Sequence, residues 1–161
     1  MISRDRDTAG RARSDRPRDR LGRPLPPGSP GVERIPDDLE LGPQQTLAFA
    51  QQLLDDGLAF NAHEVLEAAW KNGPVAERML WQGLAQYAVG LTHIQRGNAK
   101  GAGTLLRRAS ERLGSYPANA QQHGVDLAGL IAHTRELLDA LDAGDPIAEE
   151  RLRTRLCREP A

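Results

Sequence analysis

The sequence has little of three things that mark common functional classes: cysteine, aromatic side chains and long apolar runs. Its single cysteine, Cys157, excludes an internal disulfide framework and any zinc site built from several cysteines. No apolar run reaches the roughly 18–20 residues of a membrane span, and the arginine-rich N-terminus lacks the apolar stretch of a secretory signal. The formal net charge of −1 gives no reason to expect nucleic acid or a membrane as an obligate partner. We therefore expect a soluble, cytoplasmic protein.

The first 36 residues differ in composition from the rest of the 161-residue chain. Residues 1–23 hold eight arginines and four aspartates, and six of the eleven prolines lie at or before Pro36. A segment with so few apolar side chains cannot bury enough surface to offset the entropy lost on ordering. We therefore expect a disordered, basic and proline-rich arm and linker over 1–36, followed by one domain over 37–161. An arm that touches nucleic acid or an acidic partner is the functional alternative.

From about residue 39 onward, apolar residues recur at helical spacing between strong stop signals such as Asn72-Gly73-Pro74 and Gly97-Asn98. The expected helices run over about 43–56, 58–71, 75–96, 99–113 and 125–143, with a short amphipathic helix over 147–157. No stretch alternates with period two for long enough to predict a strand. The predicted fold class is all-α: a compact antiparallel helical bundle of about five helices plus a short C-terminal helix.

The helix expected over 75–96 contains 17 residues without a formal charge, between Arg78 and Arg96. A helix that is uncharged on every face is expected to be surrounded by other helices. Gly83 and Gly90 lie seven residues apart on one face, although a glycine in a helix interior costs about 1 kcal/mol. Two glycines on one face predict that a neighbouring helix approaches closely there.

Polar side chains of two consecutive helices are expected to meet. His63 and Glu67 are four residues apart and border the apolar face of the 58–71 helix. The polar face of the next helix carries amides and an imidazole, which need hydrogen-bond partners if they are buried. We therefore predict one polar cluster across this helix pair. Its expected members are His63, Glu64, Glu67, Trp70, Trp81, Gln82, Gln86 and His93.

Three interpretations of this cluster stay open. The first is a buried polar network, or the lining of a small groove, in a non-catalytic binding domain without a cofactor. In the second, His63, Glu67 and His93 hold a divalent metal such as zinc, iron or manganese. In the third, Glu67 with His63 performs acid–base catalysis in a small hydrolase-like enzyme built on the HExxE segment. The sequence favours the first, with an unidentified protein partner or a second copy, and neither a membrane nor nucleic acid.

Several single residues carry weaker signals. His123 and His133 are expected in a loop and on a polar helix face, both in contact with solvent. Cys157 is expected to be a free thiol without a role. The basic side chains of the 99–113 helix are expected to form a solvated face rather than an anion site. They are Arg107, Arg108 and Arg112.

Two segments, 60–70 and 81–109, together carry a composite motif. The first is an aromatic residue, two positions and then H-E-x-x-E-x-x-W, and the second has Q-G-L-x-Q-x-A and ends in an R-G-N turn. The residues concerned are Phe60, His63, Glu64, Glu67, Trp70, Gln82, Gly83, Leu84, Gln86, Ala88, Arg96, Gly97 and Asn98. This combination resembles the domain of unknown function 309 family over about 44–114. The resemblance implies a small all-α bundle, chiefly prokaryotic, and brings no activity with it.

Overall fold

The computed structural model describes residues 16–36 and 38–159. Its α-helices are α1 (Pro43–Asp55), α2 (Ala59–Asn72), α3 (Arg78–Gln95), α4 (Ala99–Ser115) and α5 (Leu127–Ala143). Two short 3₁₀ helices are η1 (Val75–Glu77), which leads into α3, and η2 (Glu149–Leu152), near the C-terminus. The described residues contain isolated bridges but no strand, so the all-α prediction is confirmed. No helix in this part of the chain is both long and apolar enough to cross a membrane.

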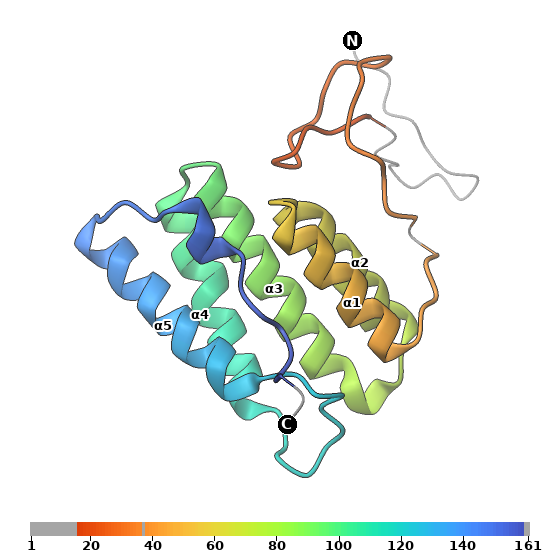
Figure 1. Cartoon of the computed structure of the whole chain (residues 1–161), viewed down its shortest axis with the longest axis vertical. Coiled ribbons are helices and arrows are strands. Elements are labelled where there is room, and N and C mark those ends of the chain that lie inside the picture. The colour runs from red at the N-terminus through yellow and green to blue at the C-terminus, as the bar shows by residue number, and fades with distance from the viewer. Residues whose placement is uncertain (1–15, 37, 160–161) are drawn as a thin grey trace.

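The helices form a row in which each helix packs against the next one along the chain (Figure 1). Helix α3 lies in the middle, with α1 and α2 to one side and α4 and α5 to the other. This position explains why α3 carries no formal charge after its first residue, Arg78, because a central helix has neighbours on most of its faces. Leu80, Leu84 and Leu91 of α3 are fully buried.

Gly83 and Gly90 lie where α4 packs on α3. A Cβ atom at Gly90 would lie 2.6 Å from Cδ2 of Leu106, and one at Gly83 would lie 2.7 Å from Cδ2 of Leu113. Both leucines are buried, so neither can swing freely into solvent to make room. The predicted close approach of a neighbouring helix at these two glycines is confirmed.

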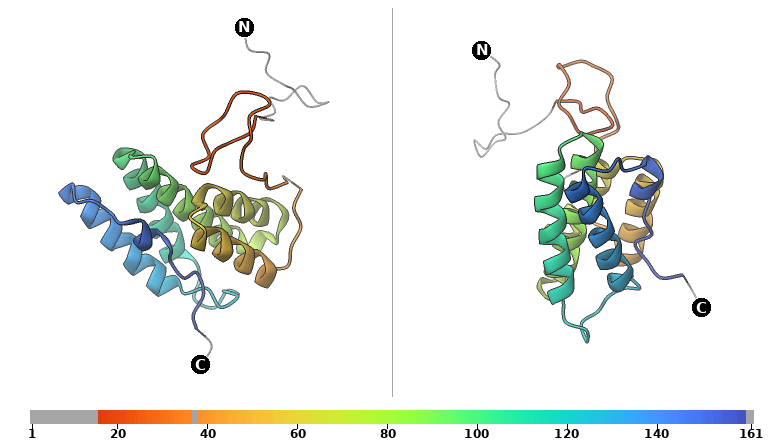
Figure 2. Two further views of the ribbon diagram at one scale, coloured as in Figure 1. Left: turned by 45° about the horizontal axis from the view of Figure 1, so that its top comes forward. Right: turned by 90° about the vertical axis from the view of Figure 1, so that its left-hand side faces the viewer.

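Residues 16–36 contain no helix, yet they contact the bundle, and Figure 2 shows them looped beyond one end of it. Arg96, directly after α3, donates from Nε to the carbonyl oxygen of Leu21 at 2.8 Å, and Arg20 donates to the carbonyl oxygen of Asp56 at 2.6 Å. Hydrogen bonds thus run in both directions between this segment and the bundle, and Ile35 joins the core. The predicted disorder falls in part on residues 1–15, which lie outside the described residues. The division into arm and domain stays a prediction.

The C-terminal helix is confirmed but short, covering Glu149–Leu152 instead of the whole of 147–157. Beyond it the backbone is extended, because tertiary hydrogen bonds replace helical ones. Asp126 donates from its backbone nitrogen to the carbonyl oxygen of Leu156 at 2.8 Å. Gln51 of α1 accepts from the backbone nitrogen of Leu156 at 2.9 Å. Long-range partners of this kind cannot be read from local helical periodicity.

Candidate functional site

Glu67 lies between two partners on the same face of α2. His63 Nε2 is 3.1 Å from Glu67 Oε2, and Lys71 Nζ is 2.9 Å from Oε1. The hydrogen bond with His63 does most to lower the pKa of Glu67 to about 2, with Lys71 adding to it and partial burial opposing it. A carboxylate with so low a pKa is a poor general base near neutral pH, because an efficient base has a pKa close to the working pH.

The two remaining residues that we expected on α2 lie to either side of this group. Glu64 lines, together with Glu67, a hollow of about 250 Å³ next to Ile35 and Lys71. Trp70 is partly buried, and Lys71 Nζ lies 5.9 Å from the centroid of its ring. The carboxylates of α2 therefore face the segment before α1 and a lysine of their own helix.

Arg112 of α4 binds the two glutamines of α3. Its Nε donates to Gln86 Oε1 at 3.1 Å, and its Nη1 donates to Gln82 Oε1 at 2.6 Å. The expectation that Arg112 lies on a solvated face is wrong, because this partly buried guanidinium satisfies both amide oxygens. These hydrogen bonds join α3 to α4, whereas the sequence pattern suggested that the glutamines meet α2.

His93 lies near the C-terminal end of α3, where Asn98 Nδ2 donates to its Nδ1 at 3.2 Å. Partial burial, with a smaller contribution from the charge of Arg96, lowers the pKa of His93. The described residues contain no group of three histidine, cysteine, aspartate or glutamate side chains placed to hold a metal ion. The alternative metal set of His63, Glu67 and His93 is therefore not assembled.

A second polar group, mostly outside the predicted cluster, lies at the start of α3. Glu77 Oε1 accepts hydrogen bonds from Trp81 Nε1 at 3.1 Å and from His123 Nε2 at 2.8 Å. The rings of Trp81 and His123 stack with centroids 5.9 Å apart and planes inclined by 26°. The side chain of His123 is only 13% exposed, so the expectation of a solvated histidine is wrong here. The same expectation is wrong for His133, whose side chain is 18% exposed and whose Nε2 bonds the carbonyl oxygen of Arg151.

The loop between α4 and α5 holds His123 in place. The residue has a left-handed backbone, with φ of 53°, which is uncommon for a residue other than glycine. Its backbone nitrogen donates to Gln121 Oε1 at 3.1 Å, and its carbonyl oxygen accepts from Gln44 of α1 at 3.2 Å. Burial, with a smaller contribution from the charge of Glu77, raises the pKa of Tyr116 at the start of this loop. The one sequence signal for the group is the spacing of four between Glu77 and Trp81.

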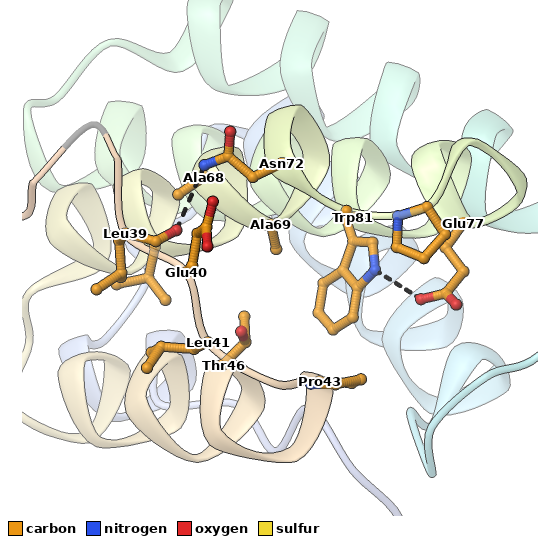
Figure 3. Close-up of a pocket in the computed structure, with 13 residues that line it drawn as sticks. Leu39, Glu40, Leu41, Pro43, Thr46, Ala68, Ala69, Asn72, Glu77 and Trp81 are labelled. Carbon is orange, nitrogen blue, oxygen red and sulfur yellow. Dashed lines mark hydrogen bonds between the residues drawn. The ribbon is translucent and has the colours of Figure 1, made fainter.

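A pocket of about 230 Å³ opens beside this polar group, between the segment before α1, the C-terminal half of α2 and the start of α3 (Figure 3). In Figure 3, the indole of Trp81 and the methyl group of Ala69 point toward the middle of the pocket. Glu40 and Glu77 line it, and no lysine or arginine is among its described lining residues. Trp81 is the one member of the predicted cluster that lines this pocket.

Exposed apolar side chains gather at the same end of the bundle. The large hydrophobic residues exposed in the described part of the chain are Leu41 (38% exposed), Val75 (72%) and Met79 (37%). Leu41 lines the pocket, Val75 follows its lining residue Pro74, and Met79 lies in the first turn of α3. Exposed apolar side chains that cluster beside a pocket indicate a surface for contact with another molecule.

Comparison with known proteins confirms the resemblance inferred from the sequence. Residues 47–105 match the model of the family described as Domain of unknown function (DUF309). An "Uncharacterized protein" of Aquifex aeolicus (strain VF5) is 27% identical over 105 residues, which are 63% of this chain and 30% of that protein. The "Uncharacterized protein YpuF" of Bacillus subtilis (strain 168) is 32% identical over 101 residues, 58% of each chain. No solved structure matches the chain.

The chain thus covers less than two thirds of the length of both relatives. The segment that matches the family contains Glu77, Trp81 and the C-terminal half of α2. His123 lies beyond it, so one partner of Glu77 comes from outside the matched segment.

Proposed function

We propose that this protein is a non-catalytic binding domain that holds a segment of a partner protein in the pocket between α1, α2 and α3. One observation carries the proposal: the pocket of about 230 Å³ opens at the end of the bundle where Leu41, Val75 and Met79 are exposed. Protein–protein contacts commonly combine an apolar surface with a pocket that a single anchor side chain fills.

The size of the pocket favours a side chain over a cofactor. Pockets that enclose drug-sized ligands typically measure about 300–1,000 Å³, whereas this one measures about 230 Å³. The described lining residues include one threonine and two glutamates but no serine, cysteine, histidine or lysine, so neither a Ser–His nor a Cys–His pair lines the pocket. Both features support binding rather than catalysis.

The polar groups around α3 have a positioning role in this proposal. Glu77 accepts one hydrogen bond from Trp81 and one from His123. These two bonds fix the orientation of the Trp81 indole, which lines the pocket. Arg112 with Gln82 joins α3 to α4 on another side of the helix. Walls that are ordered before binding lose less entropy when the partner arrives.

Selection from a phage-displayed library of random 12-residue peptides tests the proposal. Ala69→Phe places a large ring in the pocket, because Ala69 lines it and its methyl group points inward. Peptides selected on the wild-type protein should bind Ala69→Phe at least about tenfold more weakly, a loss of about 1.4 kcal/mol. Ala132→Phe is the matched control, since Ala132 is exposed on α5, and it should bind like the wild type.

Thermal unfolding of both variants checks that they are folded. Peptides that bind the wild type and Ala69→Phe equally would contradict the proposal. So would a library that yields no peptide enriched on the wild-type protein over Ala69→Phe.

A further inference from the structure

We infer that the side chain that enters this pocket is a cationic one, a lysine or arginine of the partner protein. The inference rests on the proposed function and names the chemistry of the anchor. Glu40 and Glu77 both line the pocket, and its described lining residues include no lysine or arginine. Two carboxylates with no lysine or arginine among the lining residues attract positive charge and repel negative charge.

The two carboxylates come from different elements. Glu40 lies on the exposed segment before α1, and Glu77 lies just before α3. Figure 3 shows them on two sides of the pocket, with Ala69 and Trp81 between them. A charged group that enters over Ala69 therefore meets a carboxylate on either side.

Glu77 has an oxygen available for such a group. Its Oε1 accepts from both Trp81 and His123, and Oε2 accepts no hydrogen bond from another described residue. The two bonds on Oε1 fix the orientation of the carboxylate, so Oε2 is held ready to accept from an incoming N–H group. By contrast, both oxygens of Glu67 on α2 already have cationic or imidazole partners.

The rest of the pocket suits the remainder of a basic side chain. Lysine and arginine combine a long apolar stem with a charged end. Leu41, Pro43 and Ala69 line the pocket with accessible apolar surface for the stem, while the carboxylates supply partners for the charged end. A purely apolar anchor would remove water from Glu77 without replacing its hydrogen bonds, which is unfavourable.

Four synthetic peptides test the inference: Ac-Gly-Leu-Lys-Leu-Gly-NH2 and its analogues with arginine, norleucine or glutamate at the central position. The indole N–H of Trp81 is the reporter in ¹⁵N-resolved NMR, because it donates to Glu77 and its ring lines the pocket. We expect saturable shifts with the lysine and arginine peptides. The norleucine and glutamate peptides should bind at least about fivefold more weakly, as expected for loss of one partly screened ion pair.

Two variants test whether the charged end of the peptide side chain contacts Glu77 and Glu40. Glu77→Gln and Glu40→Gln should each reduce the preference for lysine over norleucine at least about threefold. Glu40 is exposed and outside any helix, so its variant keeps the test valid if Glu77→Gln disturbs the fold.

Each unfavourable outcome has a distinct meaning. Lysine and norleucine peptides that bind equally, and lose binding in Ala69→Phe, would overturn the inference and leave the proposed function standing. Tighter binding of the glutamate peptide, or a lysine preference unchanged in both glutamine variants, would also overturn the inference alone. No saturable shift with any of the four peptides would overturn the proposed function together with the inference.

Discussion

His123 Nε2 lies 2.8 Å from Glu77 Oε1, although 46 positions separate the two residues in the chain. The same oxygen accepts from Trp81, whose indole also stacks on the His123 ring. One carboxylate oxygen thus connects the start of α3 to the loop before α5. This connection fixes Trp81, which lines the pocket in which we propose that a partner binds.

Loss of the His123 ring should destabilise the protein. His123→Asn removes the stacked ring and the bond to Glu77, while asparagine tolerates the positive φ of this position. We expect the free energy of unfolding, measured with urea, to fall by about 1–3 kcal/mol. Asn119→Ala changes an exposed residue of the same loop and should stay within about 0.5 kcal/mol of the wild type. Equal stability of the two variants would contradict the role of His123.

Alanine at Gly90 should destabilise the bundle, although alanine is the better helix former. The new Cβ would lie 2.6 Å from Cδ2 of the buried Leu106. Overpacking should outweigh the gain of about 1 kcal/mol in helix propensity, for a net loss of about 1–2 kcal/mol in urea unfolding.

The matched control for Gly90→Ala is Gly114→Ala, at a glycine of α4 that faces α5. A Cβ at Gly114 would lie at an ordinary 3.9 Å from Cδ1 of Ile131. This variant should be as stable as the wild type or more so, by up to about 1 kcal/mol. A stabilising Gly90→Ala would refute the close packing of α3 against α4.

The ion pair of Glu67 should make stability depend on acid pH. The pKa of Glu67 is about 2 in the folded protein and 4.5 without its partners. Because the folded-state pKa is the lower one, the stabilisation is complete above about pH 4.5 and is lost as the pH falls toward 2. The difference in unfolding free energy between the wild type and Glu67→Gln should therefore be larger at pH 6 than at pH 3. Partial exposure to solvent keeps this difference small.

Urea unfolding at several pH values measures this difference. Glu111→Gln, on an exposed position of α4, is the matched control for loss of one carboxylate. The difference in unfolding free energy between the wild type and Glu67→Gln should not stay constant from pH 6 to pH 3 if the His63–Glu67–Lys71 arrangement is correct. A constant difference, or one equal to that of Glu111→Gln, would contradict the arrangement.

Release of the C-terminal segment should follow from loss of the Gln51 amide. Gln51 Nε2 donates to the carbonyl oxygen of Thr154 at 2.8 Å, and its Oε1 accepts from Leu156 at 2.9 Å. Gln51→Ala should therefore speed trypsin cleavage after the exposed Arg153 and Arg155, by about tenfold if opening becomes 1.4 kcal/mol easier.

Gln52→Ala serves as the control for this experiment, because Gln52 is the neighbouring glutamine and is exposed. Its cleavage rate should match that of the wild type. Equal rates for Gln51→Ala and Gln52→Ala would mean that the amide does not hold the segment.

The helices could be predicted because their signals are local. Asn72-Gly73-Pro74 ends α2, and Gly97-Asn98 separates α3 from α4, close to where the sequence places both breaks. Asn98 also caps α4, since its side chain accepts from the backbone nitrogen of Gly101. The pairing of His63 with Glu67 is local in the same way, because residues four apart share one helix face.

The candidate site was harder to predict. The sequence predicts that Trp81 belongs to a functional cluster, and Trp81 does line the pocket, but no sequence pattern predicts its contact with His123. The helical spacing predicts that Gln82 and Gln86 face α2, whereas they bind Arg112 of α4. Helical periodicity shows which residues share a face, but not which neighbour that face meets.

By itself, the sequence determined the helices, their breaks and the glycine face of α3, because helix stops, caps and spacing act over a few neighbouring residues. The tertiary structure alone decided that Glu77 meets His123, that Gln51 holds the extended C-terminal segment, and that a pocket opens beside Trp81. These contacts depend on the rotation of each helix against its neighbours and on the path of the loops. Their partners lie dozens of positions apart, beyond the range of any local pattern.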